Sequence, residues 1–242
     1  MTSNTELFED LAIQADFRSK LYGLLAGIYN TRPDNHFAEG VLNLGQNDLF
    51  SLLEESGDLP EEAGDGLGLI RKFVAANQGR KIDELCTELA VERTRLLRGV
   101  KPGYSPPPPY ESVYVGPQDS PEMQATVSIR RLYAEEGVGL PEEVRDQPDF
   151  IGFELDFMRH LCAKEGEAWK SGDVARAAEY LEKEQSFLKE HLALWVPRFC
   201  DVMVKEARLD FYRGIALLTK GFILDEAEKV ADYLDKARDI IS

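Results

Sequence analysis

The chain has 242 residues, and its 44 Asp and Glu against 28 Lys and Arg give a formal net charge of −16. This acidity excludes nucleic acid and anionic membrane surfaces as partners, because both are bound by clustered Lys and Arg. A hydrophobic content of 43 % and a charged content of 30 % are typical of globular proteins, and a chain of this length can bury a sizeable core.

The N-terminal residues and the cysteines indicate the compartment. The N-terminal stretch is acidic and polar, and it lacks the basic and apolar regions of a signal peptide. No segment approaches the roughly 18 to 20 apolar residues of a membrane helix. Cys86, Cys162 and Cys200 are widely spaced, which argues against a disulfide framework and predicts small buried side chains. We therefore expect a cytoplasmic protein without stable membrane insertion.

Apolar residues follow helical spacing over nearly the whole chain, as at Ile82, Leu85 and Leu89. The fold class that this spacing predicts is all-α: a single globular bundle of about eight or nine helices over residues 1–242. The one candidate strand is SVYV at 112–115. The expected helices span residues 6–30, 34–56 (with a break), 60–77, 81–98, 120–137, 149–171, 173–195, 198–221 and 224–241.

Residues 99–121 interrupt the helical pattern. They hold seven of the 12 prolines of the chain, so we expect an extended, non-helical segment. A mobile linker between domains is one interpretation. Large apolar side chains such as Tyr110, Val113 and Tyr114 favour the other, an ordered loop that packs on the helices, because flexible linkers are rich in Gly and Ser or in charge. Loops of this length inside a compact domain tend to be functional.

No pattern for catalysis or metal binding is present. The three histidines, His36, His160 and His191, stand at none of the spacings that bind metals, and we expect them to be surface or packing residues. The sequence also lacks a glycine-rich phosphate loop and a nucleophile elbow. We therefore expect a protein that is not an enzyme and that holds neither a metal nor another cofactor.

One carboxylate has an unusual place. Glu154 falls near the centre of the apolar arc of the predicted helix 149–171, between Phe153 and Phe157. A buried carboxylate needs a partner. It either accepts bonds from loop backbone, from hydroxyls or from an Arg of a neighbouring helix, or it is a site residue at the foot of a groove. A catalytic acid or base is the least favoured alternative, because no suitable second group accompanies it.

Four segments carry a resemblance to a known family. They are RSKLYGLLAGIY (18–29), PPPPYESVY (106–114), PDFIGFELDFMRHL (148–161) and FLKEHLALWVPRF (187–199). In this order and separation they resemble the TorD/DmsD/NarJ family of cytoplasmic molybdoenzyme maturation chaperones, also called redox enzyme maturation proteins. The resemblance covers residues 15–222, and no single motif in it is specific.

The resemblance implies an all-helical, non-enzymatic protein. Such chaperones bind the N-terminal leader, often a twin-arginine signal peptide, of a molybdopterin-containing oxidoreductase of anaerobic respiration. They hold the apo form of this catalytic subunit during cofactor insertion and assembly, before export. The resemblance leaves a homodimer open. The peptide-binding residues that it implies are Tyr22, Leu25, Tyr110, Glu111, Ser112, Tyr114, Pro148, Asp149, Phe150 and Glu154.

One position departs from the family pattern. Many relatives have His directly after the Pro-Asp pair, where this chain has Phe150. A phenyl ring keeps the apolar contact but loses the hydrogen-bond donor and the titration near neutral pH. A role of that imidazole therefore does not transfer to this chain.

The acidity of the chain agrees with a cationic peptide as ligand. Glu111 and Asp149 are candidate ion partners for the arginines of a leader, although Asp149 could instead cap a helix, and Glu154 is better explained as structural. We expect the negative potential to concentrate around residues 110–112 and 148–150. The alternative function is an all-α scaffold or adaptor subunit of a redox complex; a helical hydrolase is less favoured.

Overall fold

The computed structural model describes residues 4–44, 50–51, 53, 59–99, 103, 105–115, 121–139 and 147–241. In these ranges the chain forms helices and no strand, so the all-α prediction is confirmed. A single antiparallel bridge joins Tyr110 to Phe150. None of the helices in these ranges combines the length and the hydropathy that crossing a membrane requires.

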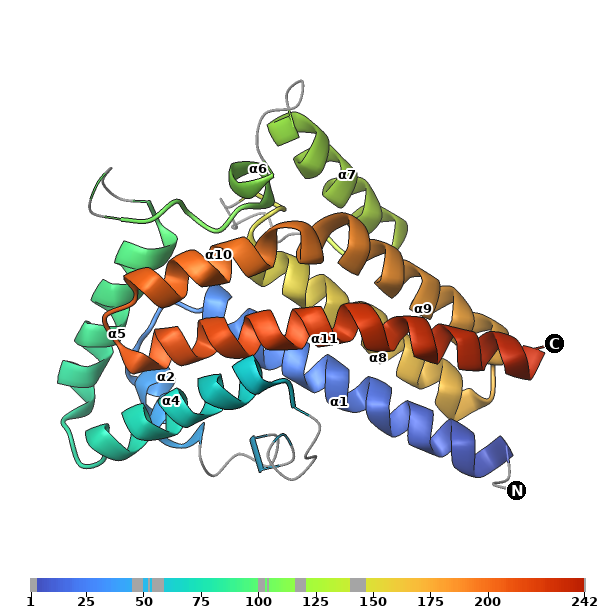
Figure 1. Ribbon diagram of the computed structural model, residues 1–242, viewed down its shortest axis with the longest axis horizontal. Coiled ribbons are helices and arrows are strands. Elements are labelled where there is room, and N and C mark those ends of the chain that lie inside the picture. Colours follow the sequence, from blue (N-terminus) through green and yellow to red (C-terminus); the bar gives the residue numbers. More distant parts are fainter. Residues whose placement is uncertain are drawn as a thin grey trace.

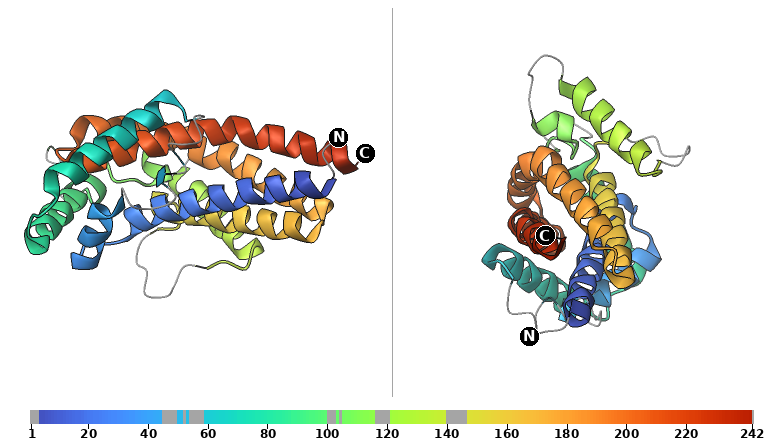
Figure 2. Two further views of the ribbon diagram at one scale, coloured as in Figure 1. Left: turned by 90° about the horizontal axis from the view of Figure 1, so that it is seen from below. Right: turned by 90° about the vertical axis from the view of Figure 1, so that its right-hand side faces the viewer.

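Long helices run side by side along the molecule and enclose the core (Figure 1). The first and last helices of the chain, α1 and α11, begin and end at the same end of this bundle, so both termini lie there (Figures 1 and 2). The bundle helices are α1 (Asn4–Asn30), α8 (Ile151–Ser171), α9 (Val174–Phe187), α10 (Ala193–Glu206) and α11 (Asp210–Ile241).

Shorter helices cover the bundle at two places. Helices α2, α4 and α5 lie at the end away from the termini, and α6 and α7 lie together on one side (Figure 1). Their bounds are α2 (Asn35–Leu42), α4 (Glu61–Asn77), α5 (Ile82–Leu97), α6 (Glu111–Tyr114) and α7 (Pro121–Glu135). The second half of the helix expected at 34–56 lies mostly outside the described residues.

Two expected helix ends are absent. The helix expected at 198–221 is divided at 207–209: its first part belongs to α10, and its second part continues into the helix expected at 224–241 to form α11. Gly221 lies inside α11, where it allows a close helix contact: a Cβ there would stand 2.8 Å from the backbone nitrogen of Ala63 in α4. The break expected between 195 and 198 is also absent, and Pro197 lies inside α10. A single turn of π-helix, η2 (Leu188–Leu192), joins α9 to α10 shortly before this proline.

The proline-rich loop contains a helical turn that the sequence analysis did not predict. The segment expected as a strand at 112–115, in a region expected to be non-helical, overlaps α6. Asp149 explains this turn, because its backbone oxygen accepts a bond from Glu111 N (3.0 Å) and its side chain accepts one from Ser112 N (3.1 Å). The Tyr114 ring packs on Trp195, with ring centroids 5.7 Å apart. Residues 100–102, 104 and 116–120 lie outside the described residues, so order along the whole loop stays a prediction.

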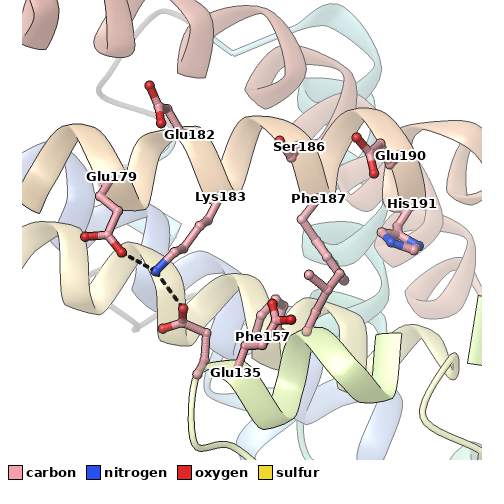
Figure 3. A pocket seen from close by; sticks show the side chains of 11 residues that line it. Glu135, Phe157, Glu179, Glu182, Lys183, Ser186, Phe187, Glu190 and His191 are labelled. Atoms are coloured by element: carbon pink, nitrogen blue, oxygen red, sulfur yellow. Dashed lines mark hydrogen bonds and ion pairs between the residues drawn. The ribbon is translucent and has the colours of Figure 1, made fainter. Parts of the chain in front are cut away.

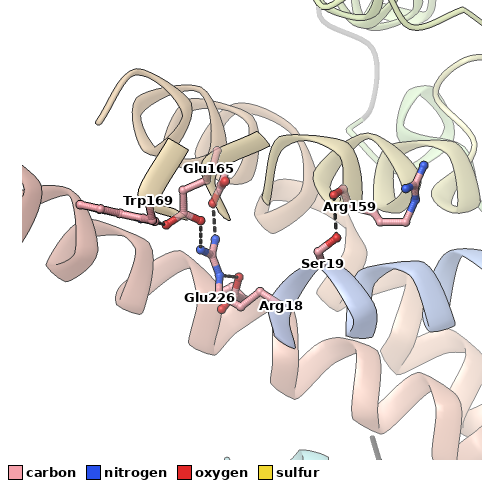
Figure 4. A network of polar contacts seen from close by, with 7 residues as sticks. Arg18, Ser19, Arg159, Glu165, Trp169 and Glu226 are labelled. Atoms are coloured by element: carbon pink, nitrogen blue, oxygen red, sulfur yellow. Dashed lines mark hydrogen bonds and ion pairs between the residues drawn. The ribbon is translucent and has the colours of Figure 1, made fainter. Parts of the chain in front are cut away.

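A buried arginine joins four helices of the bundle. Arg18 of α1 donates from Nε to Glu226 of α11 (2.7 Å), from Nη1 to Glu165 of α8 (2.9 Å), and from Nη2 to Glu184 of α9. All four side chains are buried. Figure 4 shows Arg18 between Glu165 and Glu226. Because each bond fixes one helix against α1, this Arg18 cluster constrains the rotation of α8, α9 and α11 about their axes.

The Arg18 cluster has more acid than base. One guanidinium cannot neutralise three buried carboxylates, and burial of a charge in a low-dielectric interior is costly. Burial is the main cause that raises the pKa of Glu184, to about 8, and the charges of Glu165 and Glu226 add to it while Arg18 opposes it. Glu184 therefore carries a proton in the folded protein at a pH at which an unfolded chain has released it.

We predict that Arg18→Met lowers the free energy of unfolding by about 3–5 kcal/mol, because it leaves buried carboxylates without their cation. Urea unfolding measures this loss. Lys20→Met is the matched control on the same helix: its exposed pair with Asp16 (2.7 Å) contributes about 0.5 kcal/mol or less. Equal losses in the two variants would contradict the role of the Arg18 cluster.

We also predict that part of the stability is lost as pH rises from 4.5 to about 8, the ordinary and the folded pKa of Glu184. In this window the folded state binds a proton that the unfolded state does not, so deprotonation favours unfolding, by at most about 1.4 kcal/mol per pH unit. Urea unfolding measures the free energy of unfolding across the same pH window. It should change less with pH in Glu184→Gln than in the wild type. The same slope in both proteins would show that Glu184 does not hold this proton.

Candidate functional site

The segments that carry the predicted site residues meet at one place. The proline-rich loop pairs with the turn before α8: Ile151 N donates to Pro109 O (3.1 Å), and the rings of Tyr110 and Phe150 lie 5.4 Å apart. From α7, the Tyr133 hydroxyl donates to Pro148 O (3.1 Å). Helices α6, α7 and α8 are thus connected around residues 148–150.

Three buried carboxylates lie beneath this junction. Glu111 bonds through Oε2 to Nδ1 of His191 (2.8 Å), and Glu154 accepts through Oε2 from the indole nitrogen of Trp195 (3.1 Å). Asp149 is the third, with its bond from Ser112 N. Burial is the main cause that raises the pKa of Glu154 well above its ordinary value, and the nearby charges of Glu111 and Asp149 add to it. We call Glu111, Asp149, Glu154 and His191 the junction cluster.

The junction cluster changes the interpretation of the predicted acidic residues. Glu111 and Asp149 are buried and bonded within the protein, so an ion pair with a leader stays a prediction that would require the junction to open. Asp149 does cap a helix, but that helix is α6. Glu154 is bonded as a structural residue would be, although its partner, Trp195, was not among those expected.

The remaining predicted residues divide into two groups. Tyr110, Ser112 and Tyr114 belong to the junction and are partly exposed, and Pro148 and Phe150 belong to it and are buried. Tyr22 and Leu25 are fully buried in the core on α1, and the Tyr22 ring lies 4.7 Å from the ring of Phe222 on α11. The structure therefore does not place these two side chains on the surface beside the loop.

A groove that sequence reasoning missed lies between α7 and α9. Its cavity volume is about 290 Å³. Apolar side chains line its floor, and five glutamates stand around it with one lysine (Figure 3). The residues of this α7–α9 groove are Leu132, Glu135, Glu136, Phe157, Glu179, Glu182, Lys183, Ser186, Phe187, Glu190 and His191.

The α7–α9 groove and the junction cluster share a wall. His191 lines the groove while its Nδ1 atom bonds Glu111. On the floor, the ring of Phe157 lies 4.9 Å from that of Phe187 and 4.8 Å from that of Tyr133. A ligand in the groove would therefore touch a side chain that holds α6 in place.

The acidic residues of the groove had only a weak signal in the sequence. Glu179, Glu182 and Glu190 recur on one face of α9 and η2, a pattern that also describes an ordinary solvated face. We expected the negative potential around 110–112 and 148–150. There Glu111 and Asp149 are buried, whereas Glu135, Glu179, Glu182 and Glu190 in the neighbouring groove are exposed.

The described residues contain no group of three or more His, Cys, Asp and Glu side chains that could hold a metal ion. Burial is the main cause that raises the pKa of the Cys162 and Cys200 thiols well above their ordinary value. Thiols of this kind are poor nucleophiles and poor metal ligands. The groove offers carboxylates, aromatic rings and one ammonium group, which suit the binding of a ligand with both cationic and apolar parts.

Comparisons with known proteins identify a family and several relatives of the chain. Residues 56–201 match the family model described as nitrate reductase delta subunit. The chaperone protein TorD of Vibrio parahaemolyticus is 26% identical over 120 residues, which cover 49% of this chain and 54% of the relative. The chaperone protein TorD of Aliivibrio fischeri is 23% identical over 206 residues, which cover 85% of this chain and 91% of the relative. A selenate reductase assembly chaperone protein of Thauera selenatis is 37% identical over 91 residues, 36% of this chain and 46% of the relative. The chain spans about half the length of the first curated relatives that it matches.

We predict that Glu154→Gln changes the free energy of unfolding at neutral pH by less than about 1 kcal/mol, because the amide oxygen can accept the Trp195 bond and no charge is buried. Glu154→Ala should cost about 2–4 kcal/mol, because it leaves a cavity and an unpaired indole N–H. Urea unfolding of both variants tests this. A large loss in Glu154→Gln would show that the ionised carboxylate is needed.

Proposed function

This chain belongs to the nitrate reductase delta subunit family, and from this membership we propose that it is a non-enzymatic chaperone of a molybdopterin-containing oxidoreductase. It binds the N-terminal leader of the catalytic subunit, often a twin-arginine signal peptide, in the cytoplasm. It then assists cofactor insertion and assembly before export. The names of its relatives, chaperone protein TorD and selenate reductase assembly chaperone protein, support a client of this class.

The observation that carries the proposal is the α7–α9 groove. A leader of this kind has a basic segment and an apolar segment. Exposed glutamates such as Glu182 and Glu190 attract the basic segment and speed its association. The rings of Phe157 and Phe187 on the floor offer apolar contact. Two other pockets among the described residues combine acidic and aromatic side chains, but each has only one acidic residue, Asp34 in one and Asp156 in the other.

Exposed apolar side chains beyond the His191 end of the groove extend this surface. Leu194 follows Glu190 by four residues and is exposed at the start of α10. Val113 and Val115 are exposed at α6, which packs against α10. The apolar part of a leader can therefore continue from the groove over α10 and α6.

Isothermal titration of the full chain with a synthetic leader peptide tests the proposal. The peptide should come from a molybdopterin oxidoreductase of the same genome, with a neighbouring gene as first choice. We expect binding that weakens as salt rises, because the screening length falls from about 10 Å at 0.1 M to about 3 Å at 1 M. Absence of binding to every such leader at low salt would contradict the proposed function.

We predict that the double variant Glu135→Lys/Glu190→Lys binds the leader about tenfold more weakly, a loss of roughly 1.4 kcal/mol, because two attractive charges on opposite walls become repulsive. The matched control is Asp65→Lys/Glu84→Lys, which makes the same change in net charge at exposed positions of α4 and α5 outside the groove. Titration calorimetry compares the two. Equal losses would mean that only the overall charge matters and that the groove is not the binding site.

A further inference from the structure

The α7–α9 groove already holds a cation of the protein itself. The Nζ atom of Lys183 lies 2.6 Å from Oε1 of Glu179 and 2.8 Å from Oε1 of Glu136. Glu179 is on the same helix, whereas Glu136 directly follows α7, so the ammonium group joins the two walls of the groove. Figure 3 shows Lys183 turned toward Glu179. Among the described residues that line the groove, Lys183 is the one with a permanent positive charge.

The carboxylates around Lys183 differ in their access to water. The side chain of Glu136 is 11% exposed and that of Glu179 is 60% exposed. His160 is the other basic group near Glu136, with Nε2 at 3.9 Å from Oε2, and burial lowers its pKa. Lys183 is therefore the main partner of a largely buried acid. Burial lowers the pKa of Lys183, but its bonds to Glu136 and Glu179 outweigh this effect and raise it, so the amine stays protonated.

We infer that Lys183 is an internal competitor for the basic side chains of the peptide ligand. In the free protein its ammonium group occupies Glu136 and Glu179, and a guanidinium or ammonium group of the leader displaces it. This inference rests on the proposed function and adds a residue that sets the affinity and selectivity of the groove. Neither the sequence motifs nor the names of the relatives point to this residue.

Displacement is feasible because the Lys183 side chain is long and partly exposed to solvent. It is 36% exposed and four methylene groups long, so the ammonium group can turn into solvent while the stem stays on the groove wall. In its present position the ammonium group also lies 4.8 Å from the centroid of the Tyr180 ring on the same helix, which is a weak contact to give up at a partly exposed site. The exchange replaces the ion pairs of Lys183 by similar pairs with the ligand. A ligand therefore gains binding free energy only when it brings further charges or apolar contacts.

The consequence of this competition is a threshold for binding. A peptide with one isolated lysine must break the Lys183 pairs and obtains only similar pairs in return. A peptide with adjacent basic residues and an apolar segment also gains contacts with Glu135, Glu190 and the floor. Lys183 therefore lowers the affinity for all cationic ligands and excludes the weak ones.

Titration calorimetry of Lys183→Met with the leader peptide tests this inference. We expect about threefold to tenfold tighter binding than in the wild type, because the leader no longer competes with an ion pair of this kind. The gain should disappear for the same peptide with its basic residues replaced by Gln. Lys183→Arg keeps a cation in the groove and should bind like the wild type. Thermal unfolding establishes that each variant is folded.

The matched control is Lys164→Met. Lys164 has nearly the same exposure, 37%, and pairs with Glu167 at 2.8 Å on α8, but it does not line the groove. This variant makes the same change in net charge and should weaken leader binding slightly or leave it unchanged. An equal gain in affinity for the leader in Lys183→Met and Lys164→Met would contradict the inference.

The outcomes separate the two proposals. Binding to the wild type without a gain in folded Lys183→Met would overturn the inference and leave the proposed function standing. Absence of leader binding to the wild type and to Lys183→Met would overturn both. A gain that is lost again in Lys183→Met/Glu136→Gln would support the inference, because it assigns the effect to the carboxylate that Lys183 covers.

Discussion

The pairing of Arg18 with three glutamates is the interaction on which the rest of the molecule depends. A buried guanidinium must be surrounded by acceptors, and its partners come from three different helices, which fixes α8, α9 and α11 around α1. On α9 this has a direct effect outside the core. Glu184 points inward to Arg18, so the adjacent Lys183 and the preceding Glu179 and Glu182 face the groove. The charges of the α7–α9 groove are thus oriented by a charge in the interior.

The Arg18 cluster and the junction cluster both bury carboxylates, and the two stabilise these carboxylates in different ways. In the Arg18 cluster a guanidinium bonds one oxygen of each of the three carboxylates, and the excess acid is relieved by a proton on Glu184. The junction cluster has no such cation, and its carboxylates accept bonds from His191, Trp195 and the backbone of α6. The first arrangement suits a rigid core. The second joins a short helix and a loop to the bundle through a few bonds.

Part of this structure could be predicted from the sequence, because helical spacing is a local property. The amphipathic pattern indicated the all-helical fold and the burial of Glu154. Local rules failed where distant contacts decide the outcome. A glycine such as Gly221 often ends a helix, but in the fold it allows α4 to approach α11. Helix α6 forms because Asp149, which lies far along the chain, caps it. The family resemblance indicated the residues that meet at the junction. It did not indicate the α7–α9 groove, which depends on two helices that are not neighbours in sequence.

The burial of Glu111 and Asp149 also means that reversing either charge would disturb the fold, so these positions are poor probes of an acidic surface.

The π-helical turn at Leu188–Leu192 divides one long helix into two parts with separate rotational phase. Such a turn accommodates one residue more than an α-helical turn, which shifts the following side chains by about 100° around the axis. Before it, α9 presents the acidic residues of the groove; after it, α10 presents Trp195 and Phe199 to Glu154 and Tyr114. The π-helical turn therefore lets one continuous run of helix turn acidic side chains toward the α7–α9 groove and aromatic side chains toward α6 and Glu154.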